Sequence, residues 1–200
     1  MAQLARASTC ALALAAALPG AAVPSPPAPA APVIVLPASA PPGCLPGGNG
    51  YLRARIRGAL NLDIDWRNAQ IECDGGPRPD GSGIRVSFAG PKRADGKRLR
   101  MVFGVGAALE GRNGRELPTN LTVIAEGSKR VYTTGGQGHC TVDTLRQQRL
   151  PDPTRKPRVY RIVARGFCVA PASTLNQAEH ILVSSFDFAG SAVFGDDAVR

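Results

Sequence analysis

Apolar and polar residues alternate with a period of two through most of this chain, and this constrains the fold more than any other feature. From Tyr51 to Arg67 the even positions are mainly apolar, and the odd positions carry mostly arginine, asparagine and aspartate. Shorter runs around Val86, Phe103 and Ile162 repeat the pattern. A period of two places the apolar side chains on one face of a β-strand. The sequence therefore predicts strands that each bury one face.

Turn signals separate these runs at intervals of roughly 8–14 residues, as in an antiparallel all-β fold. Examples are Asp74-Gly75-Gly76-Pro77, Asp95-Gly96 and Glu126-Gly127. No segment carries a convincing apolar stripe of helical period. The prediction is an all-β fold: a single antiparallel β-sandwich or jelly-roll-like domain with disulfides.

The segment from Tyr51 to Arg67 allows two arrangements, because a straight strand of this length is unusual. A hairpin would place Arg55 opposite Asp63 and pair opposite charges. Its three-residue turn would end at Leu60, where glycine is the usual residue. We therefore favour one bent strand with its corner at Gly58, and the hairpin is the alternative.

The first 43 residues have the composition of an export signal followed by a linker. Residues 1–22 contain Arg6, a short apolar run from Cys10 to Leu18, and small residues suited to cleavage. Residues 23–43 form a Pro/Ala-rich linker, which leaves 44–200 as the β-sandwich domain. Cys10 begins the apolar run, which does not fit a lipoprotein. The predicted location is the periplasm or the extracellular space, with no integral membrane segment in the mature chain.

Cleavage of the signal would remove Cys10 and leave an even number of cysteines in an oxidising compartment. We predict that Cys140 pairs with Cys168, because antiparallel neighbours would bring these two strand ends together. Cys44 then pairs with Cys73 by elimination. The spacings contain no Cys-x-x-Cys pair, so they do not suggest a zinc site.

The sequence contains none of the familiar catalytic motifs, and we predict no catalytic, cofactor or metal-binding residues. Asn61-x-Asp63-x-Asp65 resembles the start of a calcium loop, but Trp66 stands where that loop needs glycine. A pair of carboxylates could hydrolyse a polysaccharide, although the sequence selects no particular pair. A non-catalytic protein is therefore favoured over an enzyme.

Basic residues are the one biased feature of the composition, with 24 Lys+Arg against 15 Asp+Glu. They crowd two stretches, which would suit an anionic envelope component or an acidic protein. A general preference for arginine on solvated strand faces explains the same pattern, and composition alone favours this explanation. The candidate anion-binding residues are Lys92, Arg93, Arg98, Arg100, Arg158, Arg161 and Arg165.

Three functions follow from these features. The leading expectation is a secreted or periplasmic, non-catalytic β-domain that binds an unknown ligand as a cell-envelope binding or accessory module. The alternatives are an envelope polysaccharide hydrolase with a carboxylate pair, and a polyanion-binding protein with arginine-rich patches.

Overall fold

The structure is a computed structural model that describes residues 43–128, 130–136, 138–151 and 157–195. The predicted signal peptide, and the linker as far as residue 42, lie outside the described residues. The described part is built from antiparallel strands, with one short 3-10 helix, η1 (Asn68–Gln70). The predicted all-β antiparallel fold is confirmed.

Eleven strands form one continuous sheet. In chain order they are β1 (Tyr51–Gly58), β2 (Leu62–Arg67), β3 (Glu72–Pro77), β4 (Gly83–Ala89), β5 (Arg98–Gly106), β6 (Gly114–Glu126), β7 (Arg130–Thr133), β8 (Cys140–Arg149), β9 (Arg158–Cys168), β10 (Ala172–Thr174) and β11 (His180–Phe194).

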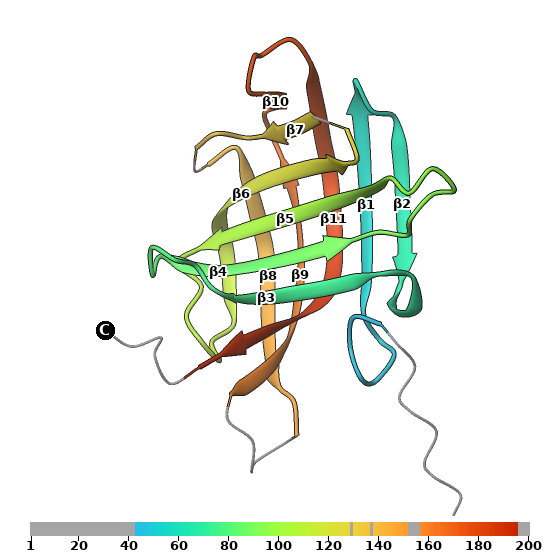
Figure 1. The fold of residues 1–200 in the computed structure, drawn as a ribbon. Coiled ribbons are helices and arrows are strands. Elements are labelled where there is room, and N and C mark those ends of the chain that lie inside the picture. Colours follow the sequence, from blue (N-terminus) through green and yellow to red (C-terminus); the bar gives the residue numbers. More distant parts are fainter. Residues whose placement is uncertain (1–42, 129, 137, 152–156, 196–200) are drawn as a thin grey trace, which may run out of the picture. The chain divides into compact units, whose positions relative to one another are not determined.

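Two long strands, β6 and β11, hold this sheet together. The N-terminal half of β6 pairs with β8, and its C-terminal half pairs with β7. Likewise β11 pairs with β10 near its start and with β9 over its second half. In Figure 1, β3 to β6 run across the direction of β1, β2, β11, β9 and β8. The sheet thus folds over itself into two layers.

The apolar residues of the alternating runs meet between the two layers. Phe88 and Phe103 come from β4 and β5, whereas Phe186 and Phe188 come from β11, and the ring centroids of Phe103 and Phe188 lie 4.8 Å apart. All four rings are buried. Few aromatic residues are present in this chain, and four of its six phenylalanines lie in this cluster.

The edge strand β3 packs directly against the second half of β11. A β-carbon added to Gly75 would lie 2.4 Å from the carbonyl oxygen of Ser191 and 2.7 Å from that of Arg85. Only glycine allows the two backbones to approach this closely. The contact brings the two layers together along this side.

The expected bent strand from Tyr51 to Arg67 is wrong, and the hairpin is correct. Strands β1 and β2 pair with Arg55 opposite Asp63 and Arg53 opposite Asp65. The turn succeeds because Gly58 adopts a φ of 117°, and because the Asn61 side chain donates to the Gly58 carbonyl at 3.1 Å. Glycine thus stands at the first position of the turn rather than at its last.

Both predicted disulfides are confirmed, as Cys44–Cys73 and Cys140–Cys168. Cys140 and Cys168 lie directly opposite each other in the ladder of β8 and β9. Cys44 belongs to the segment that precedes β1, so its bridge ties this segment to β3.

Asn68 organises the segment that the first bridge ties down. Its buried side-chain oxygen Oδ1 accepts hydrogen bonds from the backbone N–H of Leu45 at 2.8 Å and of Gly50 at 2.9 Å. The backbone carbonyl oxygen of Asn68 also accepts a hydrogen bond from the N–H of Cys44. One side chain therefore satisfies two backbone donors that form no strand ladder.

Candidate anion-binding surface

The first basic stretch is largely neutralised by carboxylates of the same domain. Arg98 and Arg100 both donate to Glu126, and Arg98 also donates to Glu72 at 2.9 Å. The two arginine side chains are only 15% and 25% exposed. Their hydrogen bonds lower the pKa of Glu126, which stays ionised. These two candidates have little charge left for a ligand.

Lys92 and Arg93 lie in the loop between β4 and β5, and both are exposed. They line different pockets: Lys92 borders one that η1 and Ala89 also line, and Arg93 borders one beside the β1–β2 turn. Arg98 lies between these pockets and lines both. The two predicted residues of this loop therefore do not line the same pocket.

The arginines of the second basic stretch lie on two different faces of β9. Positions Ile162, Ala164 and Gly166 of β9 face the core, so Arg161 and Arg165 point outward. Arg158 lies at an even position, and its Nε donates to Glu110 at 2.6 Å. This ion pair lowers the pKa of Glu110. The three arginines that the sequence grouped therefore do not share a face.

The outward pair on β9 gains a third arginine from β8. Arg146 lies opposite Val163, which stands between Arg161 and Arg165 on β9. Diagonal neighbours of this kind are about 7–8 Å apart at the backbone. Among the described residues none of the three has an ion pair, although Arg161 donates to the carbonyl of Asn49. We call Arg146, Arg161 and Arg165 the arginine triangle.

The same outward face continues over β11 to β1 and β2. Asp187 of β11 lies between Arg165 of β9 and Arg53 of β1, and Arg53 in turn faces Asp65 of β2. At the paired outward positions the face carries seven arginines and three aspartates: Arg53, Arg55, Arg57, Arg67, Arg146, Arg161 and Arg165, with Asp63, Asp65 and Asp187.

The arginines of β1 and β2 were not among the predicted site residues. Their signal was present in the odd positions of the Tyr51–Arg67 alternation. What the sequence could not supply was the strand order β1–β11–β9, which joins residues more than a hundred positions apart.

Tyr51 and Asp187 form a polar link in the middle of this face. The Tyr51 hydroxyl donates to Asp187 at 2.8 Å, and the Arg53 guanidinium lies 4.9 Å from the centroid of the tyrosine ring. Burial, followed by the contact with Asp187, raises the pKa of Tyr51. Asp187 is therefore engaged by Tyr51 and Arg53, and it forms no ion pair with an arginine of the triangle.

Carboxylates elsewhere in the domain act as partners of cations or backbone donors. Ser82, with help from Arg78, lowers the pKa of Asp80 to about 2. The pKa values of Asp95, Glu110 and Glu126 are also lowered, each mainly by a hydrogen bond from lysine or arginine. A general acid needs the opposite shift. These four groups are therefore unsuited to donate a proton at neutral pH.

The described residues contain no cluster of three or more His, Cys, Asp or Glu side chains that could hold a metal ion. Nor is any helix within them long and apolar enough to cross a membrane.

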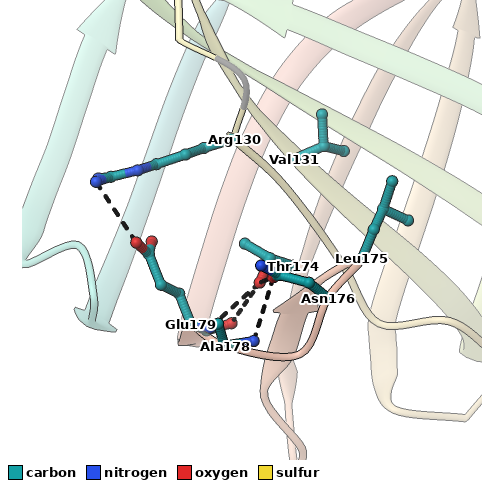
Figure 2. Close-up of a pocket in the computed structure, with 7 residues that line it drawn as sticks. All are labelled: Arg130, Val131, Thr174, Leu175, Asn176, Ala178 and Glu179. Carbon is teal, nitrogen blue, oxygen red and sulfur yellow. Dashed lines mark hydrogen bonds and ion pairs between the residues drawn. The ribbon is translucent and has the colours of Figure 1, made fainter.

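A pocket of about 250 Å³ lies beside the turn between β10 and β11. Figure 2 shows Arg130 reaching toward Glu179, whose carboxylate lies 3.5 Å from the guanidinium and also accepts from the buried Tyr132 hydroxyl at 2.5 Å. Within the turn, the Thr174 hydroxyl and the N–H of Ala178 both donate to Oδ1 of Asn176. The polar groups that line the pocket thus largely satisfy each other, and they select no ligand.

Comparison with known proteins gives no relative: no protein-family model, no curated protein and no solved structure matches this chain.

Proposed function

We propose that this chain is a non-catalytic binding domain whose ligand is an anionic polymer. The observation that carries the proposal is the arginine triangle, where three cations surround Val163 on the outer face of β8 and β9 and form no ion pair with any described residue. Polymers that bear phosphate, sulfate or carboxylate groups bind such surfaces by neutralising charge and releasing counterions. Arg53 and Arg55, on the other side of β11, are paired with Asp65 and Asp63, so the proposal depends on the arginine triangle alone.

Catalysis has less support. The four carboxylates with clearly shifted pKa values are all held in the ionised form, so the hydrolase alternative finds no general acid among them. The same proposal places the domain in the periplasm or outside the cell. Two disulfides support an oxidising compartment for it.

Salt-dependent binding to immobilised dextran sulfate tests this function. R146Q/R165Q removes two charges of the arginine triangle and leaves Arg161, which bonds to Asn49, in place. The matched control R85Q/K92Q removes two charges on and beside β4.

The triangle variant should elute at lower salt, and its slope of log affinity against log salt should fall by about two, one for each lost contact. The control should elute close to the unmodified protein. Equal weakening in both variants would leave only a nonspecific effect of net charge and refute the proposal.

A further inference from the structure

A second pocket, of about 270 Å³, has an apolar floor and a basic rim. Leu60 and Leu62 come from the β1–β2 hairpin, and Leu99 and Ala125 come from the paired strands β5 and β6. The three leucines are half-buried and pack against the core, so part of their apolar surface stays open to the pocket. A hydrocarbon chain bound there would be removed from water against apolar surface that is already present, which is favourable.

Four cations surround this floor: Arg93, Lys97, Arg98 and Arg130. The single carboxylate that lines the pocket, Glu126, is bound by Arg98 and Arg100. Lys97 is paired with Asp95 at 3.0 Å and Arg130 with Glu179 at 3.5 Å, whereas Arg93 has no ion pair among the described residues. Arg93 is therefore the rim cation that is available to an anion, because Lys97, Arg98 and Arg130 share their charge with carboxylates.

The loops that carry the rim are held in shape. Asp95 accepts from the N–H of Lys97, and the N–H of Arg93 donates to the carbonyl of Lys97 at 2.8 Å. A β-carbon added to Gly127 would lie 2.8 Å from Cγ of Lys97, so the β6–β7 turn packs against the stem of this lysine. A preformed rim lowers the cost of ordering charged side chains on binding.

We infer that this pocket binds one molecule of a small anionic amphiphile, in which a sulfate, phosphate or carboxylate group carries a short hydrocarbon chain. Its volume lies near the lower limit of small-molecule sites, roughly 300 Å³, which favours a short chain. The site is distinct from the arginine triangle, so the two proposals stand or fall separately.

Isothermal titration with octyl sulfate, kept below its micellar concentration, tests the inference. We expect saturable binding of one molecule per chain, and no comparable binding of the uncharged octyl glucoside. Hexyl sulfate, which lacks two methylenes, should bind about fifteenfold more weakly, because each buried methylene contributes about fourfold in affinity. Equal binding of octyl glucoside, or no saturation, would overturn the site.

Two variants separate the rim from the floor. R93Q/K97Q should weaken octyl sulfate binding about tenfold, and L60S, a change in a turn, should weaken it several-fold. The matched controls are R85Q/K92Q and L175S, since Leu175 is 84% exposed and lies outside this pocket. Circular dichroism establishes that each variant is folded. If the controls lose as much affinity as the test variants, the site is wrong.

Vesicles distinguish a free amphiphile from a membrane surface. Binding to phosphatidylglycerol vesicles, with none to octyl sulfate, overturns the single-molecule site. Dextran sulfate retention of R93Q/K97Q should match that of R85Q/K92Q, which also removes two charges. An additional loss in R93Q/K97Q would mean that the pocket belongs to the polymer surface.

Discussion

The two disulfides close loops of nearly equal length, which allows a controlled test of how each one stabilises the domain. The sequence separations are 28 residues for Cys140–Cys168 and 29 residues for Cys44–Cys73. In the chain-entropy description, a cross-link of this span lowers the entropy of the unfolded chain and stabilises the fold by about 3.6 kcal/mol. The contribution from the unfolded state is therefore the same for both bridges.

The folded states that remain after removal of each bridge are not the same. Cys140 and Cys168 face each other in a ladder of β8 and β9 that continues to Arg149 and Tyr160, so the backbone pairing remains without the bridge. The segment around Cys44 has no strand ladder and depends on the bridge and on Asn68. Loss of this bridge also loosens Leu45, which is only 2% exposed.

We therefore expect C140A/C168A to lose about 3.6 kcal/mol of unfolding free energy, and C44A/C73A to lose at least as much. Urea denaturation measures both losses. With a slope of roughly 2 kcal/mol/M, each midpoint should fall by about 2 M. Hydrogen exchange should show the amide protons of Leu45 and Gly50 becoming less protected in C44A/C73A alone.

Two results would refute this reasoning. One is a larger loss of stability in C140A/C168A than in C44A/C73A. The other is unchanged protection of the Leu45 amide in C44A/C73A, because it would show that Asn68 holds the segment without the bridge.

Three further changes test the packing and the charges. Asn68→Ala strands two buried N–H donors, so urea denaturation should show a loss of about 2–4 kcal/mol. The pKa of Glu126 is lowered from 4.5 in the folded protein. Its contribution to stability is therefore complete above its pKa in the unfolded chain, and is lost as the pH falls through its pKa in the folded protein. E126Q should flatten this loss of stability in acid, measured as the melting temperature against pH. Gly75→Ala, which meets two carbonyl oxygens, should cost about 1–3 kcal/mol. Gly136→Ala, which meets nothing within 4 Å, is its control.

Local pattern predicted the strands and their faces well, because alternation reports directly on burial. It failed at Gly58, where the expected turn chemistry was outweighed by the paired charges of Arg53 and Arg55 with Asp65 and Asp63. The side-chain bonds of Asn61 to Gly58 supply what the turn residues lack.

Proximity along the chain was a poor guide to the candidate surface. Arg158 is close to Arg161 in sequence, yet it lies on the opposite face of β9 and bonds to Glu110. Arg146 lies 15 positions before Arg161 and shares its face through the β8–β9 ladder. Residue type gave the charge, whereas register decided which charges meet.

The place of β11 in the chain has a consequence for how the domain folds. Its partner β1 lies about 130 positions earlier, with Leu52 opposite Phe188, and β9 and β10 also pair with β11. During synthesis, the edges of β1 and β9 that pair with β11 stay unpaired until the residues up to Phe194 have left the ribosome. Such distant pairing is slow, on the order of milliseconds to seconds. The finished sheet therefore forms only after all its strands have been synthesised.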